Sequence, residues 1–149
     1  MQATFRVQQI DHVELFVPDM GAALAWYRDV LGLEPVAKTW AWAEAGEPHM
    51  LSSDGGATML ALFHGEGPGE RDIVGHNRVA FRVDAAGFMA FLDHIENFDV
   101  PNRHGERLTR ADVVDHDLAW SIYFNDPWGN RYEVTSYDYD EIRAALAGE

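Results

Sequence analysis

The sequence predicts an α+β protein built from two tandem βαβββ modules that together form one structural domain. A strand-like segment, an acidic residue and an amphipathic helix follow one another near the start of the chain and again in its middle. Three further strand-like segments, separated by turns, follow each predicted helix. With 149 residues, 47% of them hydrophobic and 24% charged, the chain is long enough to bury a core and has an ordinary globular composition.

The first module covers residues 1–64 and opens with a predicted strand over residues 10–17. Polar and apolar residues alternate along this segment, as in a strand with one buried face. His12 and Glu14 share the face opposite the apolar residues, and the repeat assigns that face to a cavity. Asp19 follows the strand and can cap a helix whose apolar residues recur every three or four positions.

The second module covers residues 76–137 and follows a linker, residues 65–75, that is rich in glycine and charge. Its first strand is predicted over residues 76–83, and Asp84 can cap the helix after it. The strands predicted after the two helices cover residues 35–43, 49–53 and 58–64 in the first module and 105–114, 119–125 and 131–137 in the second. Residues 138–149 are predicted to form a C-terminal helix that covers an edge or a partner surface.

Charge and composition exclude several classes of partner. Eleven Lys and Arg against 25 Asp and Glu give a net charge of −14, which repels nucleic acids and anionic membrane surfaces. The chain has no cysteine, so a metal would need His, carboxylate or other oxygen ligands. No apolar run is long enough to span a bilayer, and the N-terminus lacks a signal peptide's apolar stretch, so we expect a cytoplasmic protein.

Three parts of the sequence resemble the vicinal oxygen chelate superfamily, which includes glyoxalases, bleomycin-resistance proteins, fosfomycin-resistance proteins and extradiol dioxygenases. They are IDHVELFVPD with WYRDVLGL in the first module, HNRVAFRVD at the start of the second, and SIYFNDPWGNRYEVT near the end. The resemblance spans nearly the whole chain. It implies a curved, incompletely closed, eight-stranded mixed sheet around a cavity with helices outside, a homodimer, and a small-molecule substrate. The scaffold hosts unrelated reactions, so the substrate stays open.

The resemblance also implies a divalent metal, with Fe, Mn, Zn and Ni not distinguished, that chelates two neighbouring substrate oxygens. His12 matches the first-strand ligand and Glu133 the final ligand. Arg78 occupies the position at which many relatives carry the second-half histidine, which departs from the pattern. His76 lies on the same predicted face, about 6.6 Å away along the strand, and is a third ligand only if the register slips by two residues or the metal sits elsewhere.

Two residues are candidates for catalysis because they resemble residues of extradiol dioxygenases. Tyr123 looks like the tyrosine that donates a hydrogen bond to a bound catecholate, and His116 looks like the acid–base histidine that precedes the same strand. The alignment of the repeats puts Leu60 at the place equivalent to Glu133, so the first-half carboxylate of glyoxalase I-like members is absent. The absence of this carboxylate favours a resemblance to the dioxygenase-like members, which bind the metal through two histidines and one glutamate.

The sequence therefore leaves two functions open. The first is a metal-dependent enzyme of the glyoxalase or extradiol dioxygenase type, in which Arg78 and Glu14 contact the substrate. The alternative is a metal-free small-molecule-binding protein of the bleomycin-resistance type, with an ion pair of Arg78 and Glu133 in place of the metal. Structural roles stay open for each site residue: a carboxylate partner for His12, an ion pair for Glu133, packing for Tyr123 and a solvated turn for His116.

Overall fold

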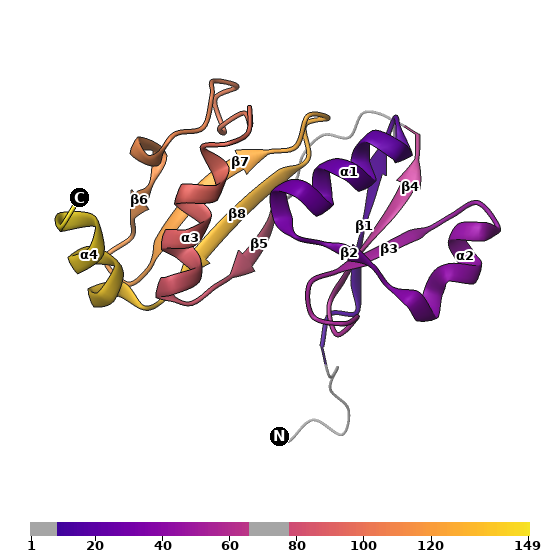
Figure 1. Ribbon diagram of the computed structural model, residues 1–149, viewed down its shortest axis with the longest axis horizontal. Helices are drawn as coiled ribbons and strands as arrows, with labels where there is room; N and C mark the ends of the chain where they lie inside the picture. The colour runs from indigo at the N-terminus through magenta and orange to yellow at the C-terminus, as the bar shows by residue number, and fades with distance from the viewer. Residues whose placement is uncertain (1–8, 66–77) are drawn as a thin grey trace, which may run out of the picture. The chain divides into compact units, whose positions relative to one another are not determined.

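The computed structural model describes residues 9–65 and 78–149, which form two compact units, one from each half of the chain (Figure 1). Each unit contains a four-stranded mixed sheet with a long helix against it. The prediction of an α+β fold made from two βαβββ modules is confirmed. Residues 66–75 of the predicted linker lie outside the described residues, as does His76.

The first unit has the strand order β1-β4-β3-β2, in which β1 and β4 are parallel and the other pairs antiparallel. Its strands are β1 (His12–Val17), β2 (Glu34–Pro35), β3 (His49–Ser52) and β4 (Met59–His64). Helix α1 (Met20–Leu31) begins where the Asp19 carboxylate accepts a hydrogen bond from the Ala22 backbone N–H at 2.9 Å. It ends at Gly32, whose φ of 67° suits a residue without a Cβ.

The predicted strand over residues 35–43 is largely wrong, because only its first residue belongs to β2. After β2 the chain forms a 3₁₀ turn (Ala37–Thr39) and a short helix, α2 (Trp40–Glu44). Alternating tryptophan and alanine imitates the two-residue period of a strand, but alanine is the best helix former and favours a helical turn here. Both tryptophans of α2 are more than half exposed, so the segment does not fill the core.

The second unit has the strand order β5-β8-β7-β6, with β5 and β8 parallel and the other pairs antiparallel. Its strands are β5 (Arg78–Arg82), β6 (Val114–Asp115), β7 (Trp120–Asn125) and β8 (Arg131–Ser136). Helix α3 (Ala85–Ile95) begins where the Asp84 carboxylate accepts a hydrogen bond from the Gly87 backbone N–H at 2.8 Å. The two units therefore repeat the same pairing and the same acidic cap.

The predicted strand over residues 105–114 is also largely wrong, because only its last residue belongs to β6. A 3₁₀ turn (Arg110–Asp112) precedes β6, and the Asp112 carboxylate accepts a hydrogen bond from the Thr109 backbone N–H at 2.7 Å. The side-chain oxygen of Asn102 accepts hydrogen bonds from the backbone N–H groups of His104, just before this segment, at 2.9 Å and of Glu106, within it, at 3.0 Å. Side chains thus take the backbone donors that a strand would have paired.

The core of the second unit lies between the sheet and α3. Alternate residues of β7 and β8 point to this core and are almost fully buried, as are three residues of α3: Ile122, Phe124, Tyr132, Val134, Phe88, Leu92 and Ile95. The residues between them on β7 and β8 lie on the opposite face of the sheet. This alternation sets Tyr123 and Glu133 on the face turned away from α3.

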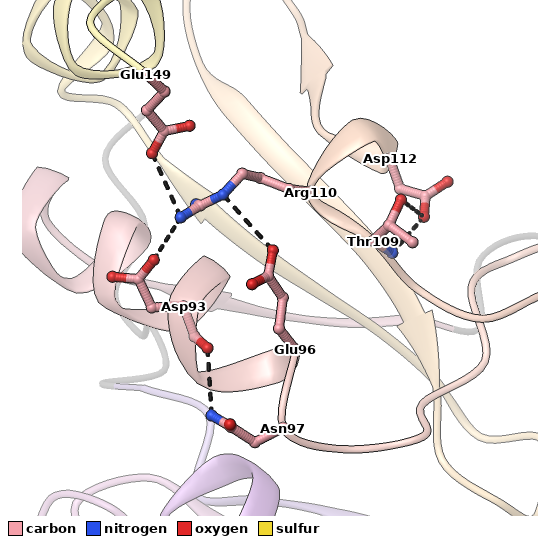
Figure 2. A network of polar contacts seen from close by, with 7 residues as sticks. All are labelled: Asp93, Glu96, Asn97, Thr109, Arg110, Asp112 and Glu149. Carbon is pink, nitrogen blue, oxygen red and sulfur yellow. Dashed lines mark hydrogen bonds and ion pairs between the residues drawn. The ribbon is translucent and has the colours of Figure 1, made fainter.

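Helix α4 (Tyr139–Ala147) packs against α3 and buries Ile142 completely. Beside it, the Arg110 guanidinium lies among three carboxylates that belong to α3, to the residue after α3 and to the second residue after α4 (Figure 2). It pairs with Asp93, with Glu96 at 3.7 Å and with Glu149 at 3.3 Å. Among the described helices, none is both long and apolar enough to cross a membrane.

Candidate functional site

His12 lies on the face of the first sheet opposite α1 and is held by acidic neighbours. Its Nδ1 is 2.8 Å from Asp11 Oδ2, and its Nε2 is 3.7 Å from Glu14 Oε1. A carboxylate only accepts hydrogen bonds, so the contact with Asp11 places a proton on Nδ1. In the neutral ring, Nε2 then keeps its lone pair and can bind a cation, an arrangement common among metal-binding histidines.

Much of the rest of this face is apolar. The strand pairing sets Met59 beside His12 and Ala61 beside Glu14. Further along the strands, the rings of Phe16 and Phe63 lie 5.9 Å apart. A buried cluster continues the apolar surface across the sheet: Val36, Met50, Met59 and Ala61, with Phe63 packed against them. The first unit therefore carries polar side chains on its edge strand β1 and an apolar surface beside them.

Glu133 lies near the middle of the second sheet, with Ala80 and Tyr123 as its neighbours on the flanking strands. The buried Ser121 hydroxyl donates a hydrogen bond to Glu133 Oε1 at 2.7 Å and lies 3.0 Å from the Thr135 hydroxyl. Ala80 ends at Cβ and cannot cover the carboxylate from the other side. Glu133 is thus a half-buried, oriented carboxylate on an open sheet face.

His116 and Tyr123 meet on this same face. Nε2 of His116 lies 2.8 Å from the Tyr123 hydroxyl, and the two rings are nearly perpendicular. His116 comes directly after β6, in a turn closed by a hydrogen bond from its backbone N–H to the Ala119 carbonyl at 2.9 Å. The two residues proposed from the sequence for catalysis are therefore in contact, and Tyr123 is the strand neighbour of Glu133.

Two arginines contact the ring of Tyr123. The Cζ atom of Arg78 lies 4.6 Å from the ring centroid, and that of Arg103 lies 5.0 Å from it. Arg78 comes from β5, as the sequence predicted. Arg103 was not predicted, because it lies in a loop where no periodic pattern indicates which way a side chain points. Asp11 and the hydrogen bond of Ser121 to Glu133 were missed for a similar reason, since only the folded structure shows such pairings.

The strand pairing corrects one detail of the repeat. Because His12 pairs with Met59 and Arg78 with Arg131, the residue equivalent to Glu133 is Ala61 rather than Leu60. Leu60 belongs to the core face, one residue earlier. The first unit still has no carboxylate at this position.

The candidate metal ligands fit a divalent cation by their donor atoms. His12 offers an imidazole nitrogen and Glu133 a carboxylate, and each is oriented by a second side chain, Asp11 or Ser121. His12 belongs to the first unit and Glu133 to the second, while His76 lies outside the described residues. Within residues 9–65 and 78–149, no group of three His, Asp or Glu side chains is arranged to hold a metal.

Comparison with known proteins gives one family. Residues 9–134 match the family described as the Glyoxalase/Bleomycin resistance protein/Dioxygenase superfamily. No curated protein matches the sequence.

Several solved structures resemble the chain over nearly its full length. A glyoxalase/dioxygenase from Nostoc punctiforme has 23% identity and a TM-score of 0.69, covering 92% of this chain and 96% of its own. A lactoylglutathione lyase from Agrobacterium tumefaciens has 27% identity and a TM-score of 0.60, with coverage of 89% and 96%. The fosfomycin resistance protein FosX from Listeria monocytogenes has 17% identity and a TM-score of 0.61, with coverage of 92% and 99%. The names of these three proteins state different activities, so the likeness establishes a shared fold and no particular activity.

Proposed function

The chain belongs to the glyoxalase/bleomycin resistance protein/dioxygenase superfamily, and we propose that it is a metal-dependent enzyme acting on a small substrate that chelates through two neighbouring oxygens. The observation that carries the proposal is the 2.8 Å contact between His116 Nε2 and the Tyr123 hydroxyl, on the sheet face that also carries Glu133. An imidazole and a phenol in contact can pass a proton between a substrate and solvent.

In this proposal His12 and Glu133 hold the metal, with His76 as the third ligand. The metal, when bound, supplies positive charge that polarises the two substrate oxygens. Asp11 fixes the proton on His12 Nδ1, so that Nε2 presents its lone pair. Ser121 orients Glu133 through its hydrogen bond to Oε1.

Tyr123 and His116 handle protons in this scheme. The Tyr123 hydroxyl donates a hydrogen bond to a substrate oxygen and thereby stabilises negative charge on it. His116 lies on the other side of that hydroxyl, in an exposed turn, so it can exchange a proton with water and with the phenol. The pair therefore connects the substrate position with solvent through two side chains.

A metal-free binding protein is the second candidate, and the identity of Arg78 favours it. Arg78 stands where the repeat would place a second-half histidine, and Arg131 is its neighbour on β8. Two guanidinium groups at this place disfavour a cation nearby. The sequence-based expectations of a homodimer and of a cytoplasmic location stay predictions under either function.

Metal analysis separates the two candidates. Protein as purified, and protein reconstituted with iron or manganese, is assayed for bound metal alongside His12→Ala, Glu133→Gln and Arg78→His. His104→Ala is the matched control, because it removes an exposed imidazole from a loop of the second unit. The enzyme proposal expects about one metal per chain, lost in the His12 and Glu133 variants and kept in the control. Metal that binds only after Arg78 becomes histidine would support the binding protein instead.

A further inference from the structure

We infer that the small molecule bound on the open face of the second sheet carries an oxyanion, a carboxylate or a phosphonate, which Arg78 and Arg103 bind beside the ring of Tyr123. The inference rests on the proposed function only in assuming that this face binds a small molecule. It adds the charge class of the ligand and assigns a role to Arg103.

The distribution of charge is the first support. The chain has only eleven Lys and Arg against 25 Asp and Glu. Strand alternation nevertheless places three arginines, Arg78, Arg82 and Arg131, on one face of one sheet. Arg103 reaches the same face at the Tyr123 ring. The strand positions of this face carry a single carboxylate, that of Glu133, so the surface is locally positive on an acidic protein.

The pairing of arginines on neighbouring strands is the second support. Arg78 on β5 and Arg131 on β8 are register partners in a parallel pair. Like charges on adjacent strands repel and weaken the pairing. An anion between or beside them relieves that repulsion, as arginine clusters do when they recognise carboxylates and phosphates. An anion bound beside Arg78 and Arg131 would therefore interact with two guanidinium groups at once.

The Tyr123 ring is the third support, because it fixes the position of two guanidinium groups. Arg78 and Arg103 lie within 4.6 and 5.0 Å of its centroid, distances at which a guanidinium is attracted to an aromatic ring. A guanidinium held in this way keeps N–H groups at its edge for an oxyanion. Because the Tyr123 hydroxyl contacts His116, the anionic group of the ligand lies close to the proton-exchanging pair.

The overall charge of the protein makes local recognition necessary. A net charge of −14 repels an anionic ligand at long range. Affinity for such a ligand must therefore come from short-range contacts with the arginines. Removal of one arginine should therefore weaken the binding of a charged ligand strongly and the binding of its neutral analogue little.

Three single-ring probes test the inference: benzoate, phenylphosphonate and benzamide, the last being a neutral analogue of the first. Each is titrated into the full-length protein, with binding followed by two-dimensional ¹H–¹⁵N NMR, both as purified and after treatment with a chelator. We expect benzoate or phenylphosphonate to bind about tenfold more tightly than benzamide, as charged hydrogen bonds provide. The anionic probe that binds more tightly shows whether the site prefers a carboxylate or a phosphonate. Equal affinity for all three probes would overturn the inference.

Variants and the chelator identify which group of the protein binds the anion. Arg78→Gln and Arg103→Gln should each weaken binding of the anion about tenfold and leave benzamide unchanged. Arg143→Gln is the matched control, because Arg143 also lies over a tyrosine ring, that of Tyr139, but on α4. An equal loss in the control would refute the assignment. A preference for anions that disappears with the chelator would also refute it while supporting a metal site, so the two proposals fail in different ways.

Discussion

Arg110 should contribute measurably to the stability of the second unit, and Arg110→Met tests this. Its side chain is 28% exposed, and its guanidinium lies among the carboxylates of three side chains that are 72%, 54% and 39% exposed (Figure 2). Pairs with this exposure are worth about 0.2–1 kcal/mol each. Losing three of them and leaving the carboxylates to repel one another should cost about 1–2 kcal/mol. Methionine is about as long as the aliphatic part of the arginine side chain, so the loss reports on the guanidinium group.

Thermal unfolding followed by circular dichroism measures this effect. For a chain of this size, about 1–2 kcal/mol lowers Tm by about 2–8 °C. The difference from wild type should shrink in 1 M salt, where the Debye length is about 3 Å. Arg143→Met is the control, since Arg143 is 65% exposed and pairs with Asp140 at 3.5 Å. A loss of stability in Arg110→Met no greater than that in Arg143→Met, or one that salt leaves unchanged, would contradict a stabilising role for these ion pairs.

Three further predictions concern other parts of the chain. Ser121→Ala removes the hydrogen bond that orients the candidate carboxylate ligand and should weaken metal binding about 10–100-fold, measured by metal titration; an unchanged Kd contradicts the proposed site. Ile142→Ala leaves a cavity under α4 and should destabilise the second unit by about 2–5 kcal/mol in urea unfolding; a loss below about 1 kcal/mol, closer to the effect of a surface substitution, would show that α4 adds little. Hydrogen bonds from Ser52 and Thr58 hold the pKa of Asp54 below its ordinary value. The stability difference between wild type and Asp54→Ala should therefore be complete at neutral pH and shrink as the pH falls below 3.8, whereas a difference independent of pH would refute this account.

The parts of the fold predicted correctly are those that local chemistry specifies. Asp19 and Asp84 each cap a helix, and strand alternation puts His12 and Glu133 on the sheet faces turned away from the long helices. The wrong strand predictions fall in segments whose sequence pattern is compatible both with a strand and with another local structure. The segment around Trp40 has a two-residue period, yet its alanines favour a helix, and tertiary context decides between them.

The candidate site was predictable only in part. Alternation along β7 fixes the face of Tyr123, but it does not predict the turn that brings His116 to the Tyr123 hydroxyl. Arg103 has no periodic neighbours, so its contact with the same ring follows from the path of a loop. Interactions within strands can thus be read from the sequence, whereas those between a strand and a loop depend on the folded backbone.

Ala61 and Glu133 occupy equivalent positions of the two units but differ sharply in their surroundings. Ala61 is 1% exposed and belongs to a tight cluster with Met50 and Met59. A carboxylate there would be enclosed among thioethers and methyl groups without a counter-charge, which is costly. The first unit thus uses this position for hydrophobic packing, so giving it a carboxylate ligand like Glu133 would require rebuilding that cluster as well as changing one residue.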